Sequence, residues 1–181
     1  MTLEALARDG LILLGCGKMG TALLTGWLAA GVPPDAVWVI EPNPTDWLIR
    51  TGVRLNEGLP TEAAVALLAV KPQMMGKALP ALQALGNGTT LFVSIAAGTT
   101  IASLEAALGE ATPIVRTMPN TPAMVGRGIT ALVGNARVPP EGMALARDLM
   151  SAVGQVVDLA TEAQIDAVTA VSGSGPAYVF H

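Results

Sequence analysis

The sequence has few aromatic and few charged residues. Of its 181 residues, 3% are aromatic and 13% are charged, whereas 51% are hydrophobic. The core must therefore be built from aliphatic side chains, which is typical of a parallel sheet covered by helices on both faces. Ten basic residues in a chain of net charge -4 form no phosphate-binding stripe, and so few aromatic rings provide little base stacking. We therefore expect no nucleic-acid partner.

Cysteine and histidine are nearly absent. The single cysteine, Cys16, excludes an internal disulfide and a multi-cysteine metal site. The single histidine, His181, is the last residue, which argues against a histidine triad or a zinc site. The apolar runs are too short for a signal-peptide core or a membrane span. These absences predict a cytoplasmic protein without a metal centre and without a membrane partner.

Short apolar runs alternate with helix-length segments, and this alternation predicts βαβ units. The expected fold is α/β, a Rossmann-type doubly wound and mostly parallel sheet over residues 1–160, followed over 161–181 by the truncated start of a helical domain. A capping-box pattern, Thr161 with Gln164, places the first helix of that domain near Glu162. Expected strands are Leu11–Leu14, Ala36–Ile40, Ala64–Val70, Thr90–Ile95, Pro113–Met118, Ile129–Val133 and Gln155–Leu159. Expected helices are Lys18–Ala30, Thr45–Thr51, Gln73–Leu85, Ile101–Leu108 and Glu141–Val153.

A glycine-rich loop follows the first strand. The segment GCGKMG, from Gly15 to Gly20, lies between an expected strand and an expected helix, which is the context of the dinucleotide-binding fingerprint G-x-G-x-x-G. In that fingerprint the first glycine makes a tight turn, the second lets a pyrophosphate approach the backbone, and the third lets helix and strand pack closely. Glycine-rich turns also form plain strand–helix connections, but the strand before and the helix after favour nucleotide binding.

Glu41 closes the second expected strand, about twenty residues beyond the glycine loop, where an acidic side chain accepts the ribose hydroxyls of NAD. A carboxylate there repels the additional phosphate of NADP, and no lysine or arginine lies between Glu41 and Arg50. The pattern therefore leans towards NAD. The alternative is that Glu41 is a solvated residue that opens the turn Pro42-Asn43-Pro44.

Three further strand ends carry small or polar residues. Ligands bind at the carboxyl ends of parallel strands, so Ala69, Val70 and Lys71 are placed to touch a cofactor, with Pro72 starting the next helix. The segments SIAAG (94–98) and TMPNTPAMVGRG (117–128) have the same character, and Asn120 and Thr121 are candidates for hydrogen bonds to a nicotinamide amide or a substrate. For each loop alone, solvent exposure or ordinary turn geometry is an alternative explanation.

These segments together resemble one family. GCGKMG, AVKPQ, SIAAG, MPNTPAMVGRG and AVTAVSGSGPAYVF (167–180) occur in the order found in pyrroline-5-carboxylate reductases, and the resemblance covers essentially the whole chain. It implies a Rossmann domain, an all-helical dimerisation domain and a homo-oligomer. It also implies hydride transfer from NADPH or NADH to the C=N carbon of the small molecule Δ1-pyrroline-5-carboxylate, the last step of proline biosynthesis.

The resemblance also implies positions for the site residues. The loop Gly15, Cys16, Gly17, Lys18, Met19 and Gly20 would hold the pyrophosphate, and Asn120 and Thr121 would lie near the nicotinamide. The cofactor would further be lined by Asn56, Ala69, Val70, Lys71, Pro72, Ala96, Ala97 and Gly98. Candidates on the substrate side, at the junction with the helical domain, are Ser172, Gly173, Ser174 and Gly175.

The chain departs from this family in two ways. It ends inside the SGSGPA region, before the helical domain that binds the substrate carboxylate, and it has Glu41 where many members carry small, polar or basic residues. The cofactor choice between NADPH and NADH therefore stays open, as does the activity of this chain alone.

The sequence provides no evident acid–base pair, so catalysis is expected to depend on orientation of cofactor and substrate, and no catalytic residue is assigned. Lys71 is an alternative as a proton donor, and Cys16 is expected to fill space in the loop. Two rival functions remain: another Rossmann oxidoreductase of the β-hydroxyacid dehydrogenase type, and a non-catalytic NAD(P)-binding module.

Overall fold

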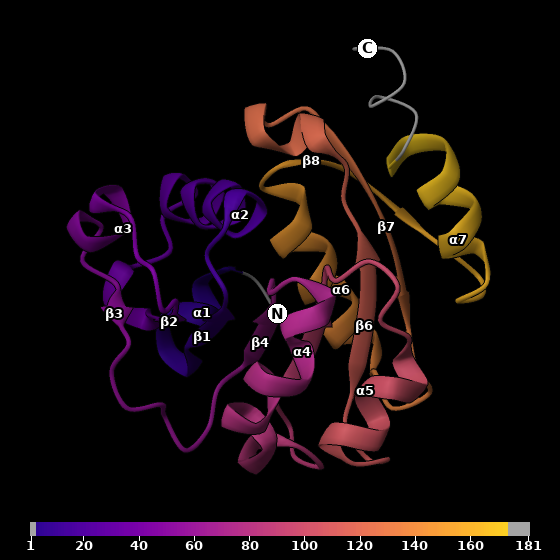
Figure 1. Ribbon diagram of the computed structural model, residues 1–181, viewed down its shortest axis with the longest axis horizontal. Helices are drawn as coiled ribbons and strands as arrows, with labels where there is room; N and C mark the ends of the chain where they lie inside the picture. The colour runs from indigo at the N-terminus through magenta and orange to yellow at the C-terminus, as the bar shows by residue number, and fades with distance from the viewer. Residues whose placement is uncertain (1–2, 174–181) are drawn as a thin grey trace.

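The computed structural model describes residues 3–173, and over this range the chain forms one twisted sheet covered by helices (Figure 1). The eight strands of this range have the spatial order β3-β2-β1-β4-β5-β6-β7-β8. The strands from β3 to β6 run parallel, β7 is antiparallel to β6, and β8 is parallel to β7. The strands are β1 (Leu11–Leu14), β2 (Val37–Ile40), β3 (Arg54–Leu55), β4 (Val65–Leu68), β5 (Leu91–Ser94), β6 (Ile114–Met118), β7 (Gly128–Gly134) and β8 (Gly154–Asp158).

The helices lie on both faces of this sheet, and in Figure 1 α4 and α5 lie in front of it while α6 lies behind. The α-helices are α1 (Leu3–Asp9), α2 (Lys18–Ala29), α3 (Asp46–Arg50), α4 (Pro72–Ala78), α5 (Ile101–Leu108), α6 (Pro140–Ser151) and α7 (Gln164–Val168). Three short 3-10 helices, η1 (Pro34–Ala36), η2 (Leu79–Leu85) and η3 (Thr121–Val125), and a π-helical turn, η4 (Thr169–Gly173), complete the described part.

Alternate residues of the central strands face two separate cores. Leu11 and Leu13 of β1 belong to the core beneath α2 and α6, whereas Ile12 and Leu14 belong to the core beneath α4, η2 and α5. All four are buried, so β1 reads as a continuous apolar run rather than as an alternating one. The predicted doubly wound α/β fold is confirmed.

Between β1 and β4 the winding of the chain changes direction. From β1 the chain passes through α2 to β2 on one side, whereas β4 pairs with the other side of β1 in the register Leu14↔Leu68. The carboxyl ends of β1 and β4 therefore flank a topological switch point, where open α/β sheets bind their ligands.

One predicted helix is wrong over half its length. The segment 73–85 was expected to be a single helix, but α4 ends at Ala78 and a 3-10 helix follows from Leu79. Pro80 has no backbone N–H and its ring clashes with the preceding turn, so an α-helix cannot continue through it unperturbed. The helix α1 and the two-residue strand β3 were not predicted.

The predicted capping box at the start of α7 is half formed. The Gln164 side chain accepts the backbone N–H of Thr161 (3.1 Å), as a capping box requires. The Thr161 hydroxyl makes no reciprocal bond, since the Gln164 N–H goes to the Thr161 carbonyl instead. The helix therefore begins at Gln164, two residues later than predicted.

An ion pair between a buried arginine and a partly exposed glutamate joins the segment before α7 to the sheet. The Arg116 side chain of β6 is 5% exposed and donates to Glu162 at 2.8 Å. The same Glu162 oxygen accepts the N–H of Ile101, the first residue of α5, at 2.8 Å. One carboxylate thus joins β6, α5 and the segment that leads into α7.

No helix in the described range is long and apolar enough to span a bilayer.

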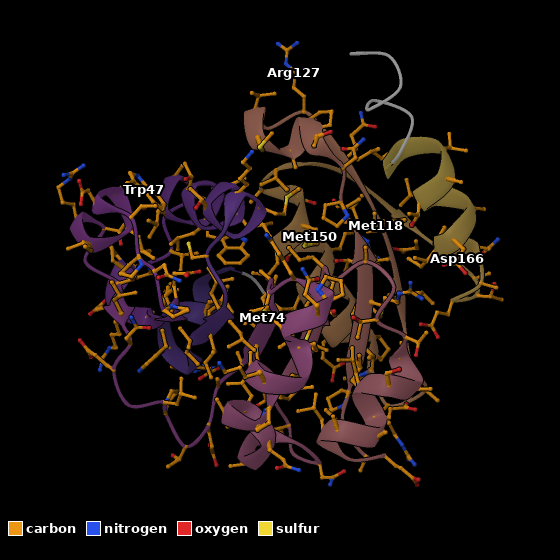
Figure 2. The ribbon with its side chains drawn as sticks, in the orientation of Figure 1. Trp47, Met74, Met118, Arg127, Met150 and Asp166 are labelled. Carbon is orange, nitrogen blue, oxygen red and sulfur yellow. The ribbon has the colours of Figure 1, made fainter. Side chains whose placement is uncertain are left out.

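Trp27 connects the two helices beneath the sheet. It is fully buried in α2, and its indole N–H donates to the Leu149 carbonyl of α6 at 2.9 Å. Replacing Trp27 by Phe removes this bond and leaves a void, so we expect the free energy of unfolding to fall by about 1–3 kcal/mol in urea titrations. Trp47→Phe in α3, at the left of Figure 2, is the matched control because Trp47 is only half-buried. Equal losses for both variants would contradict the role of the Trp27 bond.

Candidate functional site

The three glycines of the loop between β1 and α2 have different surroundings. Gly15 has a φ of +89°, and a Cβ atom there would lie 2.8 Å from Val70 Cγ1 and 3.0 Å from the Val70 nitrogen. Its own N–H donates to the Ile40 carbonyl at 2.9 Å. Gly15 thus makes a tight turn between β2 and β4 that a side chain would obstruct.

Gly20 is enclosed by protein. A Cβ atom at Gly20 would lie 2.6 Å from the Gly15 carbonyl oxygen and 3.6 Å from Ala69 Cβ. Because Gly20 has no side chain, the first turn of α2 packs directly against the carboxyl ends of β1 and β4. The third glycine therefore acts in helix–strand packing, as the fingerprint predicts.

Gly17, in contrast, faces open space. It is exposed, and a Cβ atom placed on it would meet nothing within 4 Å. Gly17 is the N-cap of α2, with no side-chain capping bond and no acidic residue in the first turn. The backbone N–H groups at the start of α2 therefore keep their capacity for an anionic ligand, which the helix dipole also favours.

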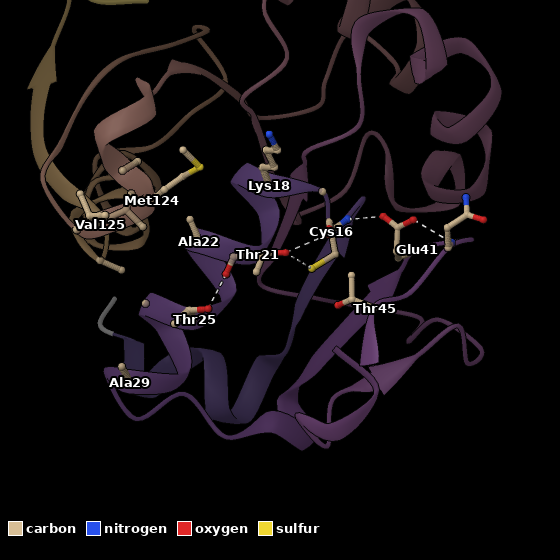
Figure 3. A pocket seen from close by; sticks show the side chains of 17 residues that line it. Cys16, Lys18, Thr21, Ala22, Thr25, Ala29, Glu41, Thr45, Met124 and Val125 are labelled. Atoms are coloured by element: carbon tan, nitrogen blue, oxygen red, sulfur yellow. Dashed lines mark hydrogen bonds between the residues drawn. The ribbon is translucent and has the colours of Figure 1, made fainter. Parts of the chain in front are cut away.

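A cavity of about 830 Å³ extends from this loop along α2 (Figure 3). Thr21, Ala22 and Thr25 of α2 form one wall, and Met124 and Val125 of η3 face them across the space. The complete lining is Cys16, Gly17, Lys18, Thr21, Ala22, Thr25, Gly26, Ala29, Glu41, Asn43, Thr45, Ala123, Met124, Val125, Gly126, Ala152 and Val153.

Glu41 connects the glycine loop to the end of β2. Its Oε2 accepts the backbone N–H of Cys16 at 2.8 Å, and its Oε1 accepts the N–H of Asn43 at 3.0 Å (Figure 3). The bond to Asn43 stabilises the turn after β2, which is the alternative role predicted for Glu41. The bond to Cys16 places the carboxylate beside the glycine loop. Both interpretations of Glu41 thus have a contact in the structure.

Burial raises the pKa of the Cys16 thiol, and the nearby Glu41 carboxylate raises it further, while a contact with Thr21 has the opposite effect. The Cys16 Sγ lies 3.7 Å from the Thr21 hydroxyl, and the residue is 5% exposed. A protonated, buried thiol is a poor nucleophile. These properties agree with the prediction that Cys16 fills space in the loop.

Comparisons with known proteins point to pyrroline-5-carboxylate reductases. The family model described as NADP oxidoreductase, coenzyme F420-dependent, matches residues 10–98. The pyrroline-5-carboxylate reductase of Pseudomonas aeruginosa is 44% identical over 173 residues, which cover 92% of this chain and 63% of that protein. Over almost its whole length the chain is similar to pyrroline-5-carboxylate reductases. It spans a little under two thirds of the length of the curated relatives that it matches.

Solved reductases of this family have the same fold. The pyrroline-5-carboxylate reductase of Coxiella burnetii superposes with a TM-score of 0.88 at 34% identity, over 95% of this chain and 66% of that one. The Plasmodium falciparum pyrroline carboxylate reductase, solved with NADP bound, superposes with a TM-score of 0.81 at 29% identity, over 96% of this chain and 65% of that one.

The residues that the reductase family implies at strand ends lie along one edge of the sheet. Ala69 and Val70 follow β4, Ala96 and Ala97 follow β5, and Asn120 and Thr121 follow β6, three neighbouring parallel strands. Asn120 also closes its own loop, since its Oδ1 accepts the Ile129 N–H at 2.9 Å. These positions stay predictions as cofactor contacts.

These six residues do not belong to the lining of the main cavity, and other predicted residues also lie apart from it. Pro72 begins α4, as expected, and lines a second cavity of about 510 Å³ between α4, η2 and α5, together with Gly98. Lys71 is exposed at the N-cap of α4. Ser172 and Gly173 belong to the η4 turn, whereas Ser174 and Gly175 lie outside the described residues.

Sequence reasoning missed part of the cavity wall. Thr21 and Thr25 lie one and two turns into α2, and Asn43 and Thr45 follow Glu41 after β2. The helical spacing from Gly17 and the place after a strand end are signals that identify all four. Nothing comparable marks Met124 and Val125, because their position depends on how η3 packs beside α2. No cluster of metal-ligating side chains occurs among the residues that the structure describes.

The different surroundings of Gly20 and Gly17 lead to opposite expectations for alanine. Gly20→Ala places its Cβ against the Gly15 carbonyl, and we expect the free energy of unfolding to fall by about 1–3 kcal/mol, the usual cost of overpacking. The methyl group of Gly17→Ala points into open space, so this substitution should change the free energy of unfolding by less than about 1 kcal/mol. Urea titration of both variants measures the difference, and a Gly17 variant as unstable as the Gly20 variant would contradict this assignment.

The environment of Cys16 predicts slow alkylation. Because its thiolate is disfavoured, the pH midpoint for reaction with iodoacetamide should lie above that of a free thiol, about 8.5. At pH 7.5 the reaction should be at least tenfold slower in the folded protein than in urea. Comparable rates in the two states would show that Cys16 is accessible and ionised, against the structure.

Proposed function

We propose that this chain forms the coenzyme-binding part of a pyrroline-5-carboxylate reductase. The enzyme would be an NAD(P)H-dependent oxidoreductase that reduces the C=N bond of Δ1-pyrroline-5-carboxylate and so completes the biosynthesis of L-proline. The bound coenzyme would supply the hydride. The observation that carries the proposal is the open Gly17, because a missing side chain at the uncapped start of α2 fits the approach of a diphosphate to backbone amides.

The residues of this chain would bind and orient. The amides at the start of α2 would hold the diphosphate, and Glu41 would face the adenine ribose at the end of β2. The ends of β4, β5 and β6 would support the nicotinamide half, with Asn120 and Thr121 nearest to it. Orientation of this kind lowers the barrier to hydride transfer without an acid–base side chain, and no catalytic residue is proposed.

Further parts of the proposal concern the protein as a whole. We propose that residues 1–160 form the dinucleotide-binding domain, and that 161–181, with Ser172, Gly173, Ser174 and Gly175, begin the helical domain on the substrate side. The resemblance to the reductases implies a homo-oligomer built through that helical domain. The scarcity of cysteine supports a cytoplasmic location.

The open face of Gly17 provides the test. Gly17→Val should retain the thermal midpoint of the parent within a few degrees, because Gly17 is exposed and a Cβ atom there meets no protein atom within 4 Å. It should weaken the binding of NADH and NADPH at least a hundredfold, because the side chain occupies the place of the diphosphate. Fluorescence titration with each coenzyme measures the loss. Binding of unchanged affinity would place the coenzyme elsewhere and contradict the proposal.

Turnover separates the reductase from a coenzyme-binding module. The protein in its natural full-length form should oxidise NADH or NADPH in the presence of pyrroline-5-carboxylate, with one proline formed for each coenzyme consumed. Coenzyme oxidation is followed at 340 nm and proline by chromatography. If the protein binds the coenzyme tightly but forms no proline, it is a coenzyme-binding module, and the proposed reductase activity is wrong.

A further inference from the structure

Hydrogen bonds from the protein backbone fix the orientation of the Glu41 carboxylate. Each of its two oxygens accepts one backbone N–H, that of Cys16 at 2.8 Å and that of Asn43 at 3.0 Å. The first bond crosses from β2 to the glycine loop and the second closes the turn after β2. A rotation of the side chain away from the cavity would break both bonds, which is costly because hydrogen bonds to a charged group are the stronger ones.

Asn56 fixes the main chain of the same residue. Its Oδ1 accepts the Glu41 N–H and its Nδ2 donates to the Glu41 carbonyl, both at 2.9 Å. Its own N–H donates to the Val39 carbonyl at 2.8 Å. The strand β3 ends at Leu55, so the Asn56 amide provides for Glu41 the pair of bonds that a longer strand would have made. Asn56 has a φ of +54°, which asparagine tolerates better than most residues.

Positive charge is scarce around this carboxylate. Among the described residues that line the cavity, Lys18 alone is cationic. Arg54, two residues before Asn56, is bound elsewhere: its Nε donates to the Asp35 carbonyl at 2.7 Å, and its guanidinium lies 4.7 Å from the centre of the Trp38 ring. Asp35 and Trp38 lie at the amino end of β2, away from Glu41.

The two nicotinamide coenzymes differ at this point. A free ribose hydroxyl donates to a carboxylate, and a carboxylate that already accepts two N–H groups still has lone pairs for it. A 2′-phosphate carries a charge of about -1.5 to -2 near neutral pH and only accepts hydrogen bonds. It would face a like charge that two backbone amides hold in place.

We propose that Glu41 makes this coenzyme site selective for NADH over NADPH, and that Asn56 is the positioning residue that keeps the carboxylate in the selective geometry. This inference rests on the proposed function, because it concerns the adenosine end of the same site.

The experiment compares dissociation constants for NADH and NADPH, measured by fluorescence titration and calorimetry. For the parent protein we expect NADH to bind at least tenfold more tightly. Glu41→Gln and Glu41→Ser should bring the ratio to within threefold of unity, mainly by tightening NADPH. Glu57→Gln is the matched control, because it removes an exposed carboxylate next to Asn56 and should leave the ratio unchanged.

The role of Asn56 needs a variant that keeps its backbone conformation. Asn56→Gly tolerates the positive φ and removes only the amide, so the ratio of the two dissociation constants should fall at least threefold. An equal loss of affinity for both coenzymes would make Asn56 a direct ligand and overturn its positioning role. Retention of the thermal midpoint in this variant separates either result from unfolding.

The outcomes distinguish the two proposals. If the parent protein binds neither coenzyme, the proposed function is wrong. If it binds both, with NADPH bound as tightly as NADH or more tightly, the proposed function stands and the proposed selectivity of Glu41 is wrong.

Discussion

The close contact between α2 and the carboxyl ends of β1 and β4 is the constraint on which the site depends. It exists because Gly20 has no side chain: a Cβ atom there would lie 2.6 Å from the Gly15 carbonyl. The contact places the start of α2 at the switch point of the sheet and leaves Gly17 facing outward. The cavity, the uncapped amides at the start of α2 and the nearness of both to Glu41 all follow from that placement.

A second constraint lies on the opposite side of the sheet and involves charge. Arg116 is buried in β6 and would be unfavourable there alone, because an unpaired buried charge costs several kcal/mol. Glu162 compensates it and also accepts the Ile101 N–H, so one carboxylate neutralises the guanidinium and satisfies an amide at the start of α5. Such a bridge contributes little net stability compared with an apolar contact of the same size. Its consequence is geometrical, because it fixes where the chain leaves the sheet towards α7.

The features that sequence predicted well are local ones. The strand before GCGKMG and the helix after it are neighbours in the chain, so the periodicity and the glycine spacing contain the whole signal. The strand β3 has two residues and its partner is distant in sequence, so no pattern marks it. The pairing of Asn56 with Glu41, fifteen residues apart, depends on that strand and was equally hidden, although the spacing from the glycine loop identified Glu41 and the family resemblance named Asn56. Pro80 was visible, and the helix predicted across it should have ended earlier.

Glu41 shows why the two readings of a site residue need not exclude each other. As a turn residue it accepts the Asn43 N–H, and as a neighbour of the glycine loop it accepts the Cys16 N–H. These bonds use one lone pair on each oxygen, so they orient the carboxylate without exhausting it as an acceptor. A ligand that donates a hydrogen bond adds to the network, whereas a ligand that only accepts must displace the carboxylate and leave it without its amides. The structural role of Glu41 would therefore strengthen the proposed discrimination between ligands, because the bonds that hold the turn also resist the movement that a phosphate would require.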